Sequence, residues 1–397
     1  MAKDGEVSLP INKPGLWILF RSFLRLGMTS FGGPAMIVHV RQLAVNRHKW
    51  LSEHEFRNGV VLSQSIPGAM VMQTAAYTGL RVRGIMGALA SYIGFGLPAF
   101  VLMLVLSMIY GRFGNLPWFL SIFKGLQIIV VAIIFHAASS FGRTIYRNYR
   151  LVGMALLSAL LFWIGVSPFL VVVAGALAGI VCLKEEPVPV PSHQVGHPSQ
   201  PKPSHLKPAL ILLFLFGAGL AVLYYTHSRL FDLALVMLKV DLFAFGGGFA
   251  SVPLMLQEIV LTRGWLDSRT FMDGIALGQI TPGPIVITAT FAGYLIEGVL
   301  GALIATLAIF TPSFFLLVFT VPYFDRLKAS TYFSRATQGV YATFVGLLLS
   351  AGVSFGTAVH WSWTGIVLGA ASLIALIRGI DILYLVLASI VFSLLAL

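Results

Sequence analysis

The sequence predicts an all-α polytopic membrane protein with about 13 transmembrane helices in two inverted-topology repeats. Three observations predict this fold: an apolar composition, long uncharged stretches and an internal repeat. Of 397 residues, 58% are hydrophobic and 10% are charged, whereas a soluble protein carries roughly a quarter charged residues. Residues 84–110 and 151–183 contain no Asp, Glu, Lys or Arg, and about 20 apolar residues suffice to cross a bilayer.

Charge and cysteine content narrow the class of protein further. The net charge of +12 comes from Lys and Arg scattered over short connections, so we expect topology determinants and no nucleic-acid partner. The single cysteine, Cys182, excludes an internal disulfide and a Cys-rich metal site. The sequence has no phosphate-cradling loop, no HExxH motif and no nucleophile elbow. We therefore expect no enzymatic activity, no cofactor and no bound metal.

The repeat covers most of the chain. Phe31-Gly32-Gly33-Pro34 recurs as Phe245-Gly246-Gly247-Gly248, a shift of 214 residues. The same register, within one residue, relates further pairs along the two halves: Trp50 and Trp265, Gln64 and Gln279, Pro67-Gly68 and Pro282-Gly283, Gly84 and Gly298, Pro98 and Pro312. A register held over more than a hundred residues indicates duplication.

The hydrophobic segments follow the repeat. The first repeat, 1–183, contains six, near 16–38, 59–80, 84–110, 116–141 and two within 151–183. The segment 184–230 holds a Pro-rich loop and one extra apolar helix. The second repeat, 231–397, has its six near 231–260, 274–293, 298–322, 337–356 and two within 361–397. The odd count before the second repeat requires it to enter the membrane inverted, as in many secondary transporters.

Loop charges favour the same arrangement. With the N-terminus inside, Arg81, Arg83 and the basic loop 142–150 lie inside, and the equivalent loops of the second repeat, which lie outside, have no basic residues there. The basic loop 41–57 conflicts with this scheme because it is placed outside. Hairpins that turn back at the glycine motifs would place that loop on the other face.

Each repeat contains two helix-breaking clusters within apolar sequence. Broken helices in a membrane are tolerated where protein or a water-lined cavity meets the freed backbone groups, and the N–H groups at half-helix N-termini favour an anion. The alternative is that small residues merely permit close helix packing. Because four breaks occur at repeat-related positions, we expect a substrate site at Gly32, Gly33, Gln64, Pro67, Gly68, Gly246, Gly247, Gln279, Pro282 and Gly283.

Ionisable residues inside apolar spans are also candidates, because burying them in lipid costs about 2.5 to 3.5 kcal/mol each on insertion scales. Arg25 and Lys239 are repeat equivalents, each six residues before its Phe-Gly-Gly motif. We expect both to bind the substrate from opposite leaflets. Asp241 and Glu258 have no charged equivalents in the first repeat and are candidates for proton coupling or counter-ions.

The ordered set of Phe-Gly-Gly and Pro-Gly motifs, with Trp50-Leu51-Ser52 and Trp265-Leu266-Asp267 between them, resembles the chromate ion transporter (CHR) family in its long two-domain form. The resemblance covers nearly the whole chain. A second proline commonly follows the family's Pro-Gly; Pro284 keeps it, whereas Ala69 replaces it. The departure argues against identical roles for the two Pro-Gly turns.

The resemblance implies export of chromate across a prokaryotic cell (inner) membrane, driven by the proton motive force. Chromate or a sulfate-like anion and the lipid bilayer are the expected partners, and a homodimer is left open. A sulfate or other oxyanion transporter and a passive anion channel of the same architecture are the alternatives.

Overall fold

The computed structural model describes residues 14–31, 36–114, 116–183 and 206–396, and their regular secondary structure is entirely helical. The first repeat forms α1 (Leu16–Thr29), α2 (Met36–Arg41) with a π-helical turn (Gln42–Arg47), α3 (Glu53–Ser65), α4 (Met70–Phe113), α5 (Pro117–Gly142), α6 (Tyr149–Trp163) and α7 (Pro168–Cys182). The connecting helix is α8 (Leu206–Thr226).

The second repeat forms the same series of elements. They are α9 (Ser228–Phe243), a 3₁₀ turn (Gly248–Ala250), α10 (Ser251–Met255) with a π-helical turn (Leu256–Thr262), α11 (Ser268–Ile280), a 3₁₀ turn (Ile285–Ile287), α12 (Thr288–Thr320), a 3₁₀ turn (Val321–Tyr323), α13 (Phe324–Ala329), α14 (Thr331–Ala358), α15 (Trp363–Ile377) and α16 (Ile382–Ala396). The two predicted repeats are therefore present as backbone structure.

Equivalent polar caps begin α3 and α11. Ser52 and Glu55 form a capping box at the start of α3, and Asp267 caps α11. Burial raises the pKa of the Asp267 carboxyl, but hydrogen bonds from Thr270 and from the backbone N–H of Arg269 outweigh this effect and hold the pKa below its usual value. These caps fix the residues at which α3 and α11 begin.

The long helices α4 and α12 each fold back on themselves at an equivalent kink. Gly84 has φ 64° and Gly298 has φ 61°, a left-handed backbone conformation that glycine adopts without strain. Beyond the first kink, Ser91 Oγ donates to the Ala75 carbonyl over 2.8 Å. A Cβ on Gly79 would lie 2.1 Å from the Gly87 carbonyl oxygen, so the two legs touch backbone to backbone.

Two predicted spans are instead pairs of half-helices that turn back. The stretch 16–38 is broken between α1 and α2, and Phe23 of α1 stacks on Trp50 with ring centroids 6.4 Å apart. The stretch 59–80 is broken between α3 and α4. There a Cβ on Gly59 would lie 2.3 Å from the Tyr77 ring, so α3 and the first leg of α4 run antiparallel. The Gly and Pro clusters end the helical ladder and allow both reversals.

These reversals correct the position of the basic loop 41–57. Arg41 pairs with Glu53 (2.9 Å), and Glu55 pairs with Arg81 at the base of the α4 hairpin (2.6 Å). The loop therefore lies on the same face as Arg81, not on the opposite face. Because both groups of cations share one face, the conflict with the positive-inside rule disappears.

Five helical segments of the described chain are long and apolar enough to cross a membrane, namely 70–113, 119–142, 207–226, 285–329 and 331–358. Shorter apolar helices of 10–17 residues, including α6, α7, α15 and α16, accompany them. The predicted number of thirteen spans is not confirmed, because half-helices replace several of the predicted crossings.

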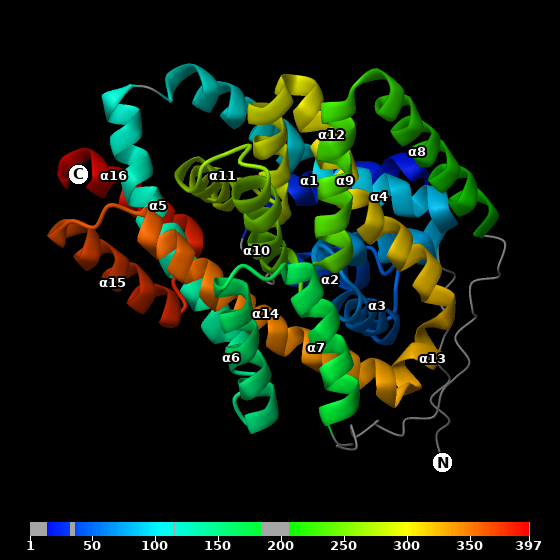
Figure 1. The fold of residues 1–397 in the computed structure, drawn as a ribbon. Coiled ribbons are helices and arrows are strands. Elements are labelled where there is room, and N and C mark those ends of the chain that lie inside the picture. The colour runs from blue at the N-terminus through cyan, green and yellow to red at the C-terminus, as the bar shows by residue number, and fades with distance from the viewer. Residues whose placement is uncertain (1–13, 32–35, 115, 184–205, 397) are drawn as a thin grey trace, which may run out of the picture.

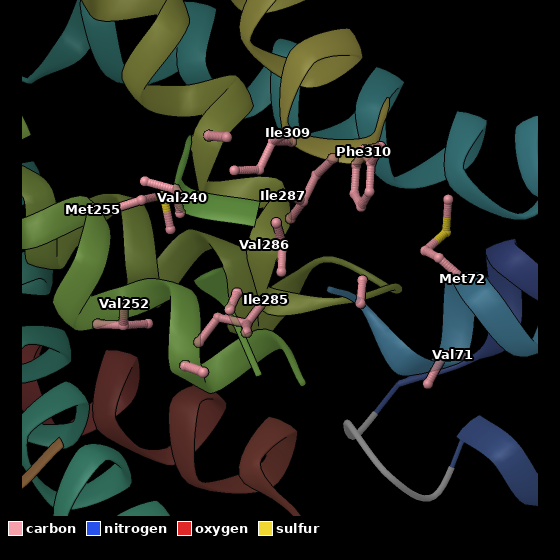
Figure 2. Packing of buried hydrophobic residues seen from close by; sticks show 14 of the residues in the cluster. Val71, Met72, Val240, Val252, Met255, Ile285, Val286, Ile287, Ile309 and Phe310 are labelled. Carbon is pink, nitrogen blue, oxygen red and sulfur yellow. The ribbon is translucent and has the colours of Figure 1, made fainter. Parts of the chain in front are cut away.

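The two repeats exchange helices. The far end of α4 reaches the base of the α12 hairpin, where Tyr110 lies 5.0 Å from Phe291 between ring centroids. Helix α5 packs against α15 and α16, and α14 packs against α6 and α7 (Figure 1). Figure 2 shows part of the buried apolar core, where Val240 and Met255 of the second repeat lie near Ile309 of α12.

Candidate anion-binding site

The tips of the half-helix pairs meet at the centre of the molecule. The backbone N–H of Gly68, in the first Pro-Gly turn (residues 66–69), donates to the carbonyl of Ala244 over 2.9 Å. The N–H of Gly283, in the second Pro-Gly turn (residues 281–284), donates to the carbonyl of Ser30 over 3.0 Å. These two bonds are repeat equivalents. Each Pro-Gly turn therefore contacts the glycine-motif segment of the opposite repeat.

A cavity of about 120 Å³ lies beside this crossing. The starts of four half-helices line it: Met36 of α2, Met70 of α4, Gly248 before α10 and Ile285 before α12. The other lining residues are Ala69, Val71, Phe141, Gly246, Gly247, Phe249, Gly278, Gln279, Thr281, Gly283, Pro284 and Ile382. A cavity of this size has room for a small solute or a few waters.

The electrostatics of the cavity come from the backbone. No ionisable side chain occurs among the residues that line it in the described part of the chain. The first N–H groups of a helix have no partner within the helix, and the helix dipole places about half a positive charge at that end. Four such ends around one cavity favour a small anion.

The glycines of the second repeat give the cavity an open backbone wall. Gly246 and Gly247 have φ 89° and 94°, which side-chain-bearing residues adopt only with strain. In the part of the chain that the structure describes, no atom lies within 4 Å of a Cβ placed on Gly247, so the backbone there borders open space. The equivalent Gly32 and Gly33 lie outside the described residues.

The two Pro-Gly turns have the same backbone but different surroundings. Gly68 and Gly283 have φ 117° and 115°, and Pro67 and Pro282 are buried within the turns. Gly283 lines the cavity. A Cβ on Gly68 would instead lie 1.9 Å from Ser313 Oγ, so this glycine is needed for close packing.

The two predicted glutamines also differ. Gln279 lines the cavity, and its Nε2 is buried without a hydrogen-bond partner among the described residues. Its equivalent, Gln64, is exposed and its backbone carbonyl accepts a hydrogen bond from Tyr341 over 2.6 Å. The Gln279 amide is thus a donor available to a ligand, whereas Gln64 lies outside the cavity lining.

The structure does not bring Arg25 and Lys239 to this cavity. Arg25 is exposed on α1 and is not among the lining residues. Lys239 Nζ lies 2.6 Å from Glu258 Oε1 and 3.8 Å from the centroid of the Phe169 ring. Each cation lies before the end of its helix and away from the cavity. Their equivalence in the sequence therefore does not make them ligands of one site.

The two predicted coupling residues have different environments. Glu258 pairs with both Lys239 and Arg263, so two cations neutralise it. Asp241 is 0% exposed and accepts hydrogen bonds from the backbone N–H and the hydroxyl of Ser313. No cation pairs with Asp241 among the described residues, so it is the better candidate for binding a proton.

A second buried carboxylate escaped the sequence prediction. Asp273 of α11 accepts hydrogen bonds from Tyr110 and Gln127, each over 2.7 Å, and is 5% exposed. It lies one residue before the predicted apolar segment 274–293, so the hydrophobic pattern does not include it. A boundary extended by one residue would have included it.

Paired repeats of discontinuous helices that meet around a central cavity are the architecture of many membrane transporters. The sequence profile of the chromate transporter family matches the chain twice, at residues 17–180 and 231–394. The chain therefore belongs to the chromate transporter family. No solved structure matches it.

Several curated relatives span most of the chain. An uncharacterized transporter of Methanocaldococcus jannaschii is 43% identical over 96% of this chain and 94% of its own length. A probable chromate transport protein of Synechococcus elongatus is 31% identical over 89% of this chain and 88% of its own. A chromate transport protein of Cupriavidus metallidurans is 30% identical, with 83% and 80% covered.

Proposed function

We propose that the cavity binds a tetrahedral oxyanion, chromate first and sulfate second, and that the protein exports it across a prokaryotic cell membrane as a secondary active transporter coupled to the proton motive force. The observation that carries the proposal is the convergence of four half-helix starts and the unpaired Gln279 amide on one cavity without an acidic lining residue. Relatives named as chromate transport proteins support the choice of anion.

The site recognises the anion by hydrogen bonding. Backbone N–H groups and an amide are neutral donors, so they stabilise a dianion without a competing counter-ion in the site. In the apolar interior these donors are more effective than in water. Arg25 and Lys239, which lie outside the cavity, attract the anion toward it through their charge and are not its ligands.

Opening to one face at a time is consistent with the two opposed sets of half-helices. A passive channel of the same architecture is the second candidate, and it predicts flux without exchange. An alternating site predicts saturation and counterflow of labelled anion.

The test uses everted membrane vesicles containing the protein and compares chromate with sulfate uptake, each with and without an imposed proton gradient. We expect saturable, gradient-dependent chromate uptake. Gradient-independent, non-saturating flux would support the channel instead, and absence of flux for both anions would refute the proposal.

A matched pair of variants tests the site. Gln279→Glu places a carboxylate in the cavity and removes the amide donor, so we expect chromate transport to be lost. Gln64→Glu makes the same change at the repeat-equivalent position outside the cavity and should transport normally. Equal loss in both variants, at equal amounts of inserted protein, would argue against this cavity.

A further inference from the structure

A polar cluster holds the first Pro-Gly turn. The backbone N–H of Ala69 donates to Ser313 Oγ over 3.3 Å, and that hydroxyl donates to Asp241 at 2.6 and 2.8 Å from the two carboxylate oxygens. A hydroxyl has one hydrogen to donate, so its bond to Asp241 leaves it an acceptor for Ala69. A directed chain of hydrogen bonds therefore runs from the turn to the buried carboxylate.

The carbonyl side of the same turn is held as well. Gln73 Nε2 donates to the carbonyl of Pro67 over 2.7 Å and to the carbonyl of Ser313 over 3.4 Å. Ser313 also donates its own backbone N–H to Asp241 over 2.7 Å. Asp241, Ser313 and Gln73 are each 0% exposed. The residues that hold the turn are thus fully enclosed by protein.

The second Pro-Gly turn has none of this cluster. At the repeat-equivalent positions, Gly27, Ala99 and Ile287 replace Asp241, Ser313 and Gln73. Pro284 replaces Ala69 and has no N–H to donate. Four differences in three separate parts of the chain surround one turn, and they explain why Ala69 departs from the family pattern. A proline at 69 would remove the donor that Ser313 accepts.

The groups that can influence the charge of Asp241 are few. Tyr92 of α4, whose hydroxyl donates to the Phe310 carbonyl, interacts with Asp241 electrostatically. Glu258 and Lys239 pair with each other, and Glu297 of α12 pairs with Arg229 of α9. The remaining ionisable side chains on α4, α8, α9 and α12 are Tyr77, Arg81, Arg83, Tyr110, Arg112, Lys207, Tyr224, Tyr225, Asp232 and Tyr294.

We propose that Ser313 is the positioning residue through which the charge of Asp241 sets the first Pro-Gly turn and thereby the anion affinity of the cavity, whose wall includes Ala69 and Met70. This inference rests on the proposed function. With Asp241 ionised, the hydrogen-bond chain is charge-assisted and the turn is held. When Asp241 binds a proton the hold weakens and the turn is released. The second turn, without the cluster, does not respond.

The expected size follows from the hydrogen bonds. A charge-assisted bond exceeds a neutral one by an amount equivalent to roughly a fivefold change in an equilibrium constant. We therefore compare the chromate affinity at about pH 6 with that at about pH 8. The difference between these two affinities should be larger by that factor in the wild type than in any variant that breaks the chain of hydrogen bonds. Ionisation of the anion itself is common to all the proteins compared and cancels.

The test measures equilibrium binding of chromate, and of sulfate in parallel, to purified full-length protein at the two pH values. Asp241→Asn and Ser313→Ala should each remove the extra pH response, and the double variant should behave like either single one. The control is Ser107→Ala, which removes a buried hydroxyl bonded only to the Met103 carbonyl of its own helix and should keep the wild-type response.

A second variant guards against misfolding. Ala69 and Pro284 both have φ −76°, so Ala69→Pro suits the backbone, although its ring would meet Ser313 Oγ. Combined with Ser313→Ala it recreates the pairing of Pro284 with Ala99. We expect this double variant to insert in wild-type amounts, bind chromate and lack the extra pH response.

A wild-type pH response in Ser313→Ala together with its loss in Asp241→Asn would overturn the role of Ser313. An equal response in wild type and Asp241→Asn would overturn the inference and leave the proposed function intact. Wild-type protein that binds neither anion at either pH would overturn the proposed function and the inference with it.

Discussion

Replacement of Gly247 by alanine tests whether this cavity is the transport site, as distinct from an effect on the stability of the fold. Gly247 has φ 94° and ψ −168°, a region essentially confined to glycine. A side chain there costs about 1–3 kcal/mol. The new methyl group meets no atom of the described residues within 4 Å, so no packing clash with them adds to this cost. It occupies roughly 30 Å³, about the share of one water, beside a cavity of about 120 Å³.

Gly298 provides the matched control. It has φ 61° and ψ −150°, in the same glycine-only region, and a Cβ there also meets no atom of a described residue within 4 Å. It lies at the kink of α12, away from the cavity lining. Gly298→Ala should therefore lose about as much stability as Gly247→Ala, by the same backbone strain of about 1–3 kcal/mol.

The assay is chromate flux into proteoliposomes per inserted molecule, with the melting temperature in detergent measured on the same samples. We expect both variants to lose several degrees, as a strain of about 1–3 kcal/mol implies. Only Gly247→Ala should lose flux, by about tenfold or more, equivalent to roughly 1.4 kcal/mol of lost site free energy. Equal flux in the two variants would refute the assignment of the cavity.

Arg25→Gln should lower chromate transport per inserted molecule at low salt and Arg47→Gln should not, because Arg25 lies in α1 close to its end at Thr29, whereas Arg47 is the last residue of the π-helical turn, at the end of its half-helix away from the cavity; equal rates for both would contradict this. Gly79→Ala should lower the melting temperature in detergent by a few degrees, because the Cβ clashes with backbone. Gly153→Ala, where a Cβ meets nothing, should be neutral or stabilising, and the opposite order would contradict the packing of the hairpin. Because the folded-state pKa of Asp267 is lowered, its stabilisation exists above the unfolded value of about 3.9 and is lost as pH falls through the folded one. As the pH falls from about 5 to about 3, the melting temperature of Asp267→Asn should therefore decrease less than that of the wild type. The same dependence of melting temperature on pH in both proteins would count against the cap.

The sequence predicts helical class, duplication and helix breaks because each has a local cause. Apolar runs and Gly or Pro clusters act on their own neighbourhood, and the repeat register is visible as identity. Whether the chain crosses the membrane or turns back after a break is decided by distant contacts. The stacking of Phe23 on Trp50 and the close approach of Gly59 to Tyr77 fix the reversal, and neither is visible in a hydrophobic profile.

The candidate site likewise has some features that the sequence predicts and others that depend on distant contacts. Gly246, Gly247, Gln279 and Gly283 were predicted from the repeated breaks, and all four line one cavity. Repeat equivalence misled where the two halves have diverged, as with Gln64, which is exposed. A pattern argument assigns equal roles to equivalent residues, but side-chain burial depends on the partner helix, which differs between the halves.

The exchange of helices between the repeats has a consequence for biosynthesis. Helix α5 is covered by α15 and α16, which are made after every other helix of the described chain. At roughly 5–20 residues per second, the first repeat must stay in the bilayer for some tens of seconds with this face bare to lipid or to a chaperone. The cavity wall is completed by Ile382 at the start of α16, so its closure follows the synthesis of α15, and a chain stopped before α15 would leave α5 uncovered.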